Sequence, residues 1–420
     1  MEEKLENLVK LYKEKNFSTL ITSGQEFVNE NASSAMAWNL LALGHRHTGN
    51  IEEAKKIYVH LLELNPNNFL LNTNLGNLYM SIGKLNDAIG CFNLALKIQP
   101  NHPGTLEAIG IAYQDVGKLE EAISSFRNAI EADKTHQGAR YHLARILVRQ
   151  KAYEEAIKHF DKTDYGLSKS HQLECIYYLG DKNLFYEKYG TLIGKGKINP
   201  LMASLGSHAS IRYGLPDKNP FCSSPMNFIE KMNISKKDGF DQILIDKIIN
   251  YHKGNENDFK SQPLLNKGEQ SSGNLFLIKL DFIQNLKEII LKKVTQYRKK
   301  FKDCDQGFIK NWPENFTIYG WLVAIKTGGH LAAHIHKEGW LSGSLYFNLP
   351  KKANTSEGNI AFSVDGANYP TDGKEFPKKI IEIEKGDIVM FPSSVFHNTI
   401  PFSSDEERVS FAFDIIPAKT

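Results

Sequence analysis

Three histidines stand close together in the C-terminal half of the chain, at positions 330, 334 and 336 of the stretch GGHLAAHIHKEGWLSGSLYFNLP. His334 and His336 are two residues apart, so on a β-strand both imidazoles point to the same face. Two neighbouring imidazoles are natural ligands for a divalent transition metal, and without a metal or another partner they would crowd each other. The pair indicates a metal site. His330 lies beyond an expected turn and is interpreted as a strand-end or surface histidine.

A third candidate ligand, His397, occurs downstream in the stretch GDIVMFPSSVFHNTIPF. Gly386 and Asp387 are expected to form a turn, and the apolar residues after them a buried strand. His397 then emerges where the chain turns again. If this strand neighbours that of His334 and His336 in a barrel, three imidazoles can converge on one ion.

The last predicted strand, RVSFAFDII, places Arg408 and Ser410 on the face opposite its large apolar side chains. A buried guanidinium needs an anion, and its planar fork matches a carboxylate best. Asp414 shares this face but lies about 20 Å from Arg408 along an extended strand. Glu382 or Glu384 from another strand is an alternative partner. Otherwise, an arginine at the back of a metal pocket indicates a small dicarboxylate ligand.

Short alternating segments, rich in β-branched and aromatic residues, must position these candidates. Turn-forming residues such as KTGGH, SEGN and SSDEE separate the segments. Many short strands at this spacing are typical of a sandwich or barrel. Helices are expected before them at 241–252 and 280–301, so we predict a double-stranded β-helix (jelly roll) with supporting helices. The expected strands lie within 316–325, 341–350, 358–364, 379–392, 397–402 and 408–416.

The first half of the chain repeats with a period of 34 residues. Small residues such as Gly76 and Gly110 recur where two antiparallel helices must approach closely, and large ones fill the gap to the next pair. A glycine in the middle of each unit makes the turn. This pattern resembles the tetratricopeptide repeat. The clear units are 35–68, 69–102 and 103–136, a weaker one is 137–164, and 2–31 and 165–215 are interpreted as degenerate helical ends.

The two patterns predict a two-domain chain of the α+β class. We expect a tetratricopeptide-repeat α-solenoid over 1–213, a linker at 214–230 and the jelly roll over 231–420. Repeat arrays of this kind present a concave groove to a peptide or partner protein. The alternatives are a purely structural scaffold and ordinary solvated helix surfaces. Residues expected to face the groove, where they would favour an acidic segment or a chain terminus, are Arg46, Asn77, Arg145 and Arg149.

Composition narrows the kinds of partner, site and cellular location that we expect for the protein. The chain has 51 basic and 48 acidic residues, a net charge of +3, which offers no case for nucleic acid or an anionic membrane as partner. Its four cysteines are scattered without a Cys-x-x-Cys pair, which argues against a disulfide framework or a zinc knuckle. No run of about 18 apolar residues occurs, and the charged N-terminus lacks the features of a signal peptide. We therefore expect a cytoplasmic protein.

The stretches HIHKEGWLSGSLYFNLP, GDIVMFPSSVFHNTIPF and RVS resemble the 2-oxoglutarate/Fe(II)-dependent oxygenases. They are most similar to the branch of that superfamily that carries tetratricopeptide repeats, and NPFCSSPMNFI and GEQSSGNLF resemble it as well. The resemblance covers roughly residues 217–416, and the repeats extend it over most of the chain. It implies Fe(II), 2-oxoglutarate and O2 as cofactor and cosubstrates.

By this resemblance His334 is the first metal ligand and His397 the distal one. Arg408, helped by Ser410, binds the distal carboxylate of 2-oxoglutarate. The implied reaction decarboxylates 2-oxoglutarate to succinate and carbon dioxide and hydroxylates a substrate C–H bond. Two further residues of the site are implied, although each also fits a plain packing role: Tyr346 as a hydrogen-bond donor to the cosubstrate and Trp321 as a wall of the pocket.

The sequence departs from the family at one ligand. The common set is His-x-Asp/Glu…His, and here His336 stands where the carboxylate is expected. His336 either ligates the metal, giving three imidazoles, or turns away and leaves its position to water. Glu338 is a third candidate, although four residues from His334 it is too far along a strand without a bulge. We favour His336 as a ligand.

Two other functions fit part of the pattern. A cupin-type metalloprotein would use the three histidines without 2-oxoglutarate, since the spacing of Gly386, Pro392 and His397 matches much of a cupin motif. The cupin glutamate is missing, however, and a cupin has no need for Arg408 and Ser410. The other alternative is a non-catalytic interaction protein whose barrel is inert or sensory.

Overall fold

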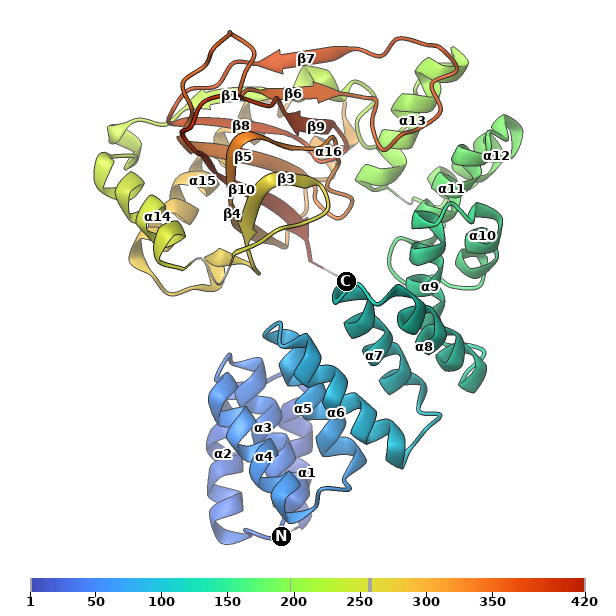
Figure 1. Cartoon of the computed structure of the whole chain (residues 1–420), viewed down its shortest axis with the longest axis vertical. Coiled ribbons are helices and arrows are strands. Elements are labelled where there is room, and N and C mark those ends of the chain that lie inside the picture. Colours follow the sequence, from blue (N-terminus) through green and yellow to red (C-terminus); the bar gives the residue numbers. More distant parts are fainter. Residues whose placement is uncertain (1, 197, 256–258, 419–420) are drawn as a thin grey trace. The chain divides into compact units, whose positions relative to one another are not determined.

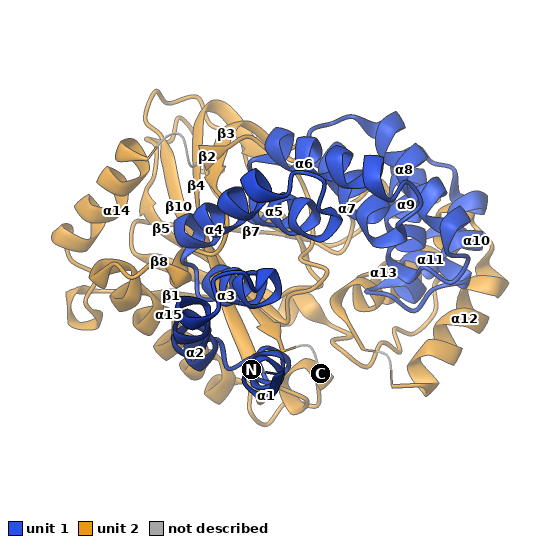
Figure 2. Ribbon diagram, turned by 90° about the horizontal axis from the view of Figure 1, so that it is seen from below, with its two compact units in different colours: residues 1–175 blue, residues 176–420 orange. Residues whose placement is uncertain are grey.

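The computed structural model describes residues 2–196, 198–255 and 259–418. The chain forms two compact units, residues 1–175 and 176–420, shown in different colours in Figure 2. The division falls within helix α11 (Ser168–Leu179). The expected fold class is confirmed, because helical repeats come first and antiparallel sheets consistent with a jelly roll follow. The domain boundaries expected around residues 214–230 stay a prediction.

Unit 1 is an array of antiparallel helix pairs, coloured blue to teal in Figure 1. Each of the four units expected from the 34-residue period forms one pair, and the N-terminal residues form another in the same register. The pairs are α1 (Glu2–Lys13) with α2 (Phe17–Glu30), α3 (Ala35–His47) with α4 (Ile51–Leu64), α5 (Phe69–Ser81) with α6 (Leu85–Ile98), α7 (Pro103–Asp115) with α8 (Leu119–Ala132), and α9 (Gln137–Arg149) with α10 (Tyr153–Asp161).

Recurring caps set where each pair begins. The side chain before the first helix accepts a hydrogen bond from the backbone N–H three residues on, which satisfies a donor that the helix leaves free. These caps follow the repeat period and are Ser34, Asn68, His102 and His136.

The turn inside each helix pair needs a residue in the left-handed backbone conformation. Gly83 has φ +72°, and Gly49 and Gly117 have φ +82°. Glycine adopts this conformation at no steric cost. In the flanking pairs Lys15 and Lys151 take the same place, at φ +59° and +61°.

Close helix approach explains the small residues of the repeat. A Cβ atom on Gly76 would lie 2.6 Å from the ring of Phe92, and one on Gly110 would lie 2.6 Å from the ring of Phe126. Both phenylalanines are fully buried. The small/large pattern seen in the sequence is therefore the packing contact between the two helices of each pair.

Unit 2 begins with helices and continues into the β region. Helix α13 joins the β region through the loop between β6 and β7: Arg212 forms an ion pair with Asp372 at 2.7 Å, and His208 lies 3.2 Å from Asp365. The helices of unit 2 after α11 are α12 (Lys182–Gly194), α13 (Pro200–Tyr213), α14 (Gln242–Gly254), α15 (Asp281–Lys300) and α16 (Gly307–Lys310), with 3-10 turns at Pro225–Phe228, Lys236–Asp238 and Leu275–Leu277.

Within the described residues the strands form two antiparallel sheets, one of seven strands in the order β1-β8-β5-β10-β4-β3-β2 and one of three in the order β7-β6-β9. Five of the six segments expected as strands contain one strand, the segment 379–392 contains parts of two (β7 and β8), and β1 to β3 are additional. The strands are β1 (Glu230–Asn233), β2 (Phe259–Lys260), β3 (Leu265–Ser271), β4 (Phe316–Leu331), β5 (Leu341–Asn348), β6 (Ile360–Ser363), β7 (Lys378–Ile381), β8 (Asp387–Pro392), β9 (Phe396–Thr399) and β10 (Arg408–Pro417).

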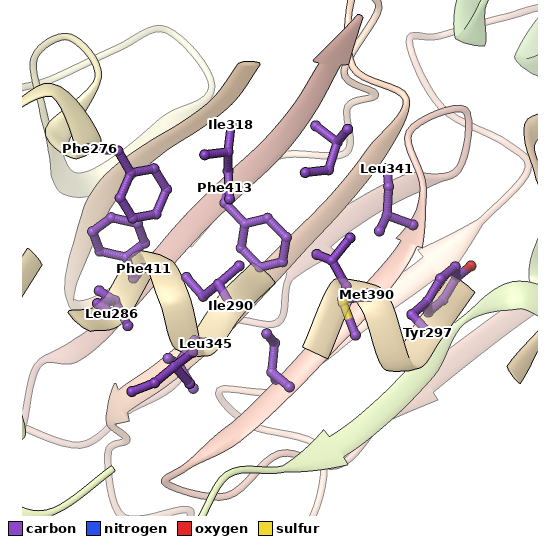
Figure 3. Close-up of a cluster of buried hydrophobic side chains, with 14 of the residues drawn as sticks. Phe276, Leu286, Ile290, Tyr297, Ile318, Leu341, Leu345, Met390, Phe411 and Phe413 are labelled. Atoms are coloured by element: carbon purple, nitrogen blue, oxygen red, sulfur yellow. The ribbon is translucent and has the colours of Figure 1, made fainter. Parts of the chain in front are cut away.

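The larger sheet carries its core on the outer face, where α15 packs against it (Figure 3). Phe411 and Phe413 of β10 meet Leu286 and Ile290 of α15 in this cluster. Because side chains alternate along a strand, Arg408 and every second residue after it face the inside of the jelly roll. The alternation expected for the last strand is confirmed.

No helix of the described part of the chain is long and apolar enough to cross a membrane.

Candidate metal centre

The segment with His334 and His336 connects β4 of the larger sheet to β5. The sequence predicts a strand here, but residues 332–340 lie outside both sheets. The exception is a single antiparallel bridge between His334 and His397 of β9, with backbone N–H to carbonyl distances of 3.2 and 3.1 Å. The chain leaves β4 at this point to contact the smaller sheet. That bridge brings the two parts of the sequence side by side.

The three expected imidazoles converge. One ring nitrogen from each of His334, His336 and His397 lies within 4.8 Å of the other two. The Nε2 atoms of His334 and His336 are 3.1 Å apart. Two nitrogens about 2.1 Å from one ion and at right angles would be about 3 Å apart. The observed spacing therefore fits two ligands of a shared ion.

Hydrogen bonds at the other ring nitrogen orient each histidine. The Nδ1 of His334 lies 2.8 Å from the carbonyl oxygen of Ala332, and that of His397 lies 3.2 Å from the carbonyl of Val395. The Nδ1 of His336 lies 2.6 and 2.7 Å from the two carboxylate oxygens of Asp414. All these partners are acceptors, so Nδ1 carries the proton and Nε2 keeps its lone pair for a metal.

Burial keeps the rings of His334 and His397 neutral. It lowers the pKa of His334 to about 4, with the neighbouring His336 adding to the effect. Burial also lowers the pKa of His397 well below its usual value, again with help from the adjacent histidines. Neutral imidazole is the form that binds a metal, so both rings are ready to ligate near neutral pH.

Asp414 belongs to the site in a way that sequence reasoning missed. The sequence indicates Asp414 only as a distant partner of Arg408. In the structure its Oδ1 also accepts a hydrogen bond from the Ser342 hydroxyl at 2.6 Å, and that hydroxyl lies 2.7 Å from the Ser393 hydroxyl. Strand pairing that places Asp414 opposite Ser342 produces the contact, and no local pattern reveals such pairing.

Arg408 lies on the inner face of β10 and is buried. Its Nε–H donates to the carbonyl of Gly358 at 3.0 Å, and Nη1 donates to the Ser410 hydroxyl at 3.3 Å. No aspartate or glutamate of the described residues forms an ion pair with it, so the alternative partners Glu382 and Glu384 do not neutralise it. Burial lowers the pKa of the guanidinium. An unpaired buried cation of this kind calls for an anion from outside.

Tyr346 stands beside this cation on β5, opposite Ser410 of β10. The Arg408 Cζ lies 4.9 Å from the centre of the tyrosine ring. The Tyr346 hydroxyl is directed toward Arg408 and Ser344 but makes no hydrogen bond of acceptable geometry with any described residue. Because a buried hydroxyl without a partner is costly, it suits a ligand that supplies an acceptor.

Three half-buried residues lie on the inner face of the larger sheet between Asp414 and Arg408. Trp321, Ala412 and Ser344 lie side by side on β4, β10 and β5, the central strands of the larger sheet. All three residues are half-buried, although most of their neighbours on these strands are buried. The Trp321 ring lies 5.6 Å from that of His336. The inner face is therefore accessible between Asp414 at one end and Arg408 at the other.

Other residues considered from the sequence stay outside the group. Glu338 is exposed, and it is not among the residues that gather around the three histidines. His330 is half-buried at the end of β4, paired with Asn266 of β3, as its interpretation as a strand-end histidine predicts.

The residues fit a metal ion and a small dicarboxylate. One ring nitrogen of each histidine lies close to those of the other two, and the groups that orient the rings are acceptors at Nδ1. On the inner face of the larger sheet, the guanidinium of Arg408 and the hydroxyl of Tyr346 provide a cation without a carboxylate and a donor without an acceptor among the described residues. Carboxylate binding by a planar guanidinium is among the strongest charge-assisted contacts available.

Comparison with protein families agrees with both parts of the chain. Residues 319–414 match the family described as "Putative 2OG-Fe(II) oxygenase". Residues 35–68 and 57–90 match tetratricopeptide-repeat families. Residues 81–163 match the family of subunit 3 of the anaphase-promoting complex (cyclosome). The chain therefore matches tetratricopeptide repeats in its first half and the putative 2OG-Fe(II) oxygenase family over residues 319–414, the two resemblances that the sequence predicts.

Solved structures resemble the chain more distantly. The pilF protein of Pseudomonas aeruginosa is 15% identical, with 46% of this chain and 89% of that chain covered and a TM-score of 0.42. A tetratricopeptide repeat protein from Parabacteroides merdae is 16% identical over 59% of this chain and 97% of that one, with a TM-score of 0.41. MamA from Desulfovibrio magneticus is 17% identical over 38% and 91%, with a TM-score of 0.35. No curated protein matches the sequence.

Proposed function

We propose that this protein is an Fe(II)- and 2-oxoglutarate-dependent hydroxylase. Its chain matches tetratricopeptide repeats and the 2OG-Fe(II) oxygenase family. In this proposal His334, His336 and His397 hold the metal. Arg408 and Ser410 bind the distal carboxylate of 2-oxoglutarate.

The observation that carries the proposal is the buried Arg408 without an anion, on the same inner face as Asp414, which contacts one of three converging histidines. Neither feature is sufficient alone. A histidine cluster by itself would suit a cupin, and a buried arginine by itself would suit a structural ion pair. Together they favour a ligand that offers a chelating group to the metal and a carboxylate to the guanidinium, which is the chemistry of a 2-oxo diacid.

When bound, iron with 2-oxoglutarate and O2 supplies an oxidant that places one oxygen atom in a substrate C–H bond, while the cosubstrate leaves as succinate and carbon dioxide. The chain's own residues position and shield this chemistry. Arg408 orients the diacid through its carboxylate, and the Tyr346 hydroxyl donates to it. Phe391 packs 4.6 Å from the ring of His397, ring centre to ring centre, which limits water at that ligand.

A cavity beside the metal centre is the candidate site for the prime substrate. It has a volume of about 440 Å3 and shares Trp321 and Asp414 with the metal centre. Several of its other lining residues carry polar groups, among them Lys260, Gln262 and Gln270, although most of the exposed wall is apolar. An apolar wall with a few polar groups is typical of a site for an organic ligand. Recruitment of a peptide or protein by the repeats is part of the same proposal, because arrays of this type bind such partners.

An anaerobic Fe(II) titration tests the proposal. The oxygenase predicts a visible charge-transfer band that appears after 2-oxoglutarate is added to the Fe(II)-loaded protein. Metal binding that is indifferent to 2-oxoglutarate would support the cupin alternative instead. Failure to bind Fe(II) would support the non-catalytic interaction protein. Release of succinate, screened over pools of peptides and metabolites for products heavier by one oxygen, then identifies the substrate.

A further inference from the structure

The three-histidine site is one negative charge poorer than the usual ligand set of its family. A metal dication in a buried position is more costly to hold with three neutral imidazoles than with two imidazoles and a carboxylate. His336 occupies the position of the missing carboxylate. The question is whether the chain supplies that charge elsewhere.

Asp414 is an acidic group in direct contact with one of the three rings. Both of its carboxylate oxygens lie at hydrogen-bond distance from the Nδ1 of His336, at 2.6 and 2.7 Å. Its residue is 8% exposed, so water screens the contact little. No lysine or arginine of the described residues forms an ion pair with Asp414, and its charge is therefore directed to His336.

The position of Asp414 is fixed from three sides. It lies on β10 between β5 and β4, opposite Ser342 and Tyr319. The Ser342 hydroxyl donates to Oδ1 at 2.6 Å and itself contacts the Ser393 hydroxyl at 2.7 Å. The Ser393 carbonyl in turn accepts from the backbone N–H of His336 at 3.1 Å. The carboxylate of Asp414 and the imidazole of His336 therefore belong to one hydrogen-bond network that includes Ser342 and Ser393.

We propose that Asp414 is a positioning residue that supplies, through His336, the negative charge which the usual ligand set places directly on the metal. The inference rests on the proposed function for the identity of the metal. The Nδ1–H of His336 donates to the carboxylate, which orients the ring and makes its Nε2 a stronger donor. Asp414 itself does not touch the ion.

Fe(II) binding by Asp414→Asn, measured anaerobically without 2-oxoglutarate, is the first test. Asparagine keeps the size and one acceptor oxygen but removes the charge. We expect Fe(II) affinity to fall by about 10- to 100-fold, the range found when partners of ligating histidines are removed. Asp387→Asn is the matched control, because Asp387 is also buried in the larger sheet but bonds to Asn233 and the backbone of Glu384. Its affinity for Fe(II) should not change.

The double variant His336→Asp/Asp414→Asn separates charge from packing. It moves the carboxylate to the position of the usual ligand and removes the one behind it. We expect it to bind Fe(II) more tightly than Asp414→Asn alone, and its Co(II) spectrum to shift as one nitrogen ligand is exchanged for oxygen. A purely structural Asp414 predicts the reverse, because the double variant loses both members of the contact. Wild-type affinity in Asp414→Asn, or a double variant no tighter than the single one, would overturn the proposal.

A measurement on the unaltered protein covers the case in which Asp414→Asn does not fold. In the Zn(II)-loaded chain the proposal predicts a strongly downfield exchangeable proton on the Nδ1 of His336, visible by NMR after histidine 15N labelling. Its absence would refute the contact. These readouts need no turnover. If the Fe(II) affinities and the NMR signal are as expected but the protein does not use 2-oxoglutarate, only the proposed function is contradicted. If the protein uses 2-oxoglutarate but these results are not found, only the role of Asp414 is contradicted.

Discussion

The guanidinium of Arg408 stacks over the ring of Tyr346, with its Cζ 4.9 Å from the ring centre. The two residues sit on neighbouring strands, and both side chains are buried. The cation has no carboxylate partner and the hydroxyl has no hydrogen bond among the described residues. Burying such a pair without a ligand lowers the stability of the folded protein. Substitutions at these two residues should therefore affect ligand affinity and stability differently.

Replacing Arg408 by Met should weaken the binding of 2-oxoglutarate. Loss of one partner of a buried charged contact costs about 2–5 kcal/mol, so we expect cosubstrate affinity to fall by about 30-fold or more. Fe(II) affinity should stay within about twofold, because Arg408 does not contact the histidines. Without the diacid, the variant should melt at or above the wild-type temperature, since an unpaired buried charge is removed. Thermal melts with and without 2-oxoglutarate check both parts; a retained shift on adding it would contradict the role of Arg408.

Tyr346→Phe isolates the hydroxyl. Because that hydroxyl has no partner among the described residues, its removal should change the free energy of unfolding by less than about 1 kcal/mol. Affinity for 2-oxoglutarate should fall by about 5- to 10-fold, as for one lost hydrogen bond. Isothermal titration with the diacid, on protein loaded with Zn(II), measures the second effect. Unchanged affinity would assign Tyr346 to packing.

The three histidines are not expected to be equivalent. His397→Ala should abolish metal binding and turnover, because His397 is buried and bridges to His334. His336→Ala should weaken metal binding and also destabilise the protein by about 1–3 kcal/mol, since Asp414 then loses the donor for its buried carboxylate. Metal titration and urea unfolding of the two variants distinguish these outcomes. Full metal affinity in His336→Ala would mean that the site works with two protein ligands.

The helical half of the fold was predictable because its determinants are local. Caps, turn glycines and small/large contacts recur from one 34-residue unit to the next, as Ser34, Gly49 and Gly76 illustrate. These features recur within the reach of one helix pair, so the period alone reveals them. The strands of the jelly roll were predictable from their alternation for a similar reason.

The candidate site was only partly predictable because its contacts are distant in sequence. The types and parity of His334 and His336 indicated a metal, yet the segment is not a strand and its rings converge through a bridge to His397. Asp414 reaches His336 by the registers of β10 against β5 and β4, which depend on the whole sheet. Sequence spacing placed Asp414 on the correct face but could not show its partner.

The glycine contacts of the repeats predict opposite effects of one substitution at two sites. In Gly76→Ala the new methyl would lie 2.6 Å from the buried ring of Phe92, so we expect destabilisation by about 1–3 kcal/mol. Gly90 is exposed in the middle of α6, where a new methyl group would have no described atom within 4 Å, and Gly90→Ala should stabilise by about 0.5–1 kcal/mol. Thermal unfolding followed by circular dichroism compares the two. Equal effects would contradict the close approach of α5 and α6.

His208 links helix α13 to the β region and should make stability depend on pH. Its Nδ1 lies 2.6 Å from the Tyr177 hydroxyl and its Nε2 lies 3.2 Å from Asp365. Arg212 and Asp372 are the other charged groups around it. Burial lowers the pKa of His208 to about 4, although Asp365 acts in the opposite direction. The neutral ring, which accepts from Tyr177 and donates to Asp365, is the form that the folded protein favours.

As the pH falls, the unfolded chain takes up this proton first, at about pH 6.5, while the folded chain resists until about pH 4. The contribution of the neutral ring is therefore complete above pH 6.5 and is lost on acidification toward pH 4. Its size is about 3 kcal/mol, since each pKa unit corresponds to about 1.4 kcal/mol. His208→Gln cannot titrate, so its free energy of unfolding should fall less than that of the wild type between pH 7 and pH 4. Urea titrations at both pH values measure the difference, and parallel losses in the two proteins would show that His208 is not the titrating group.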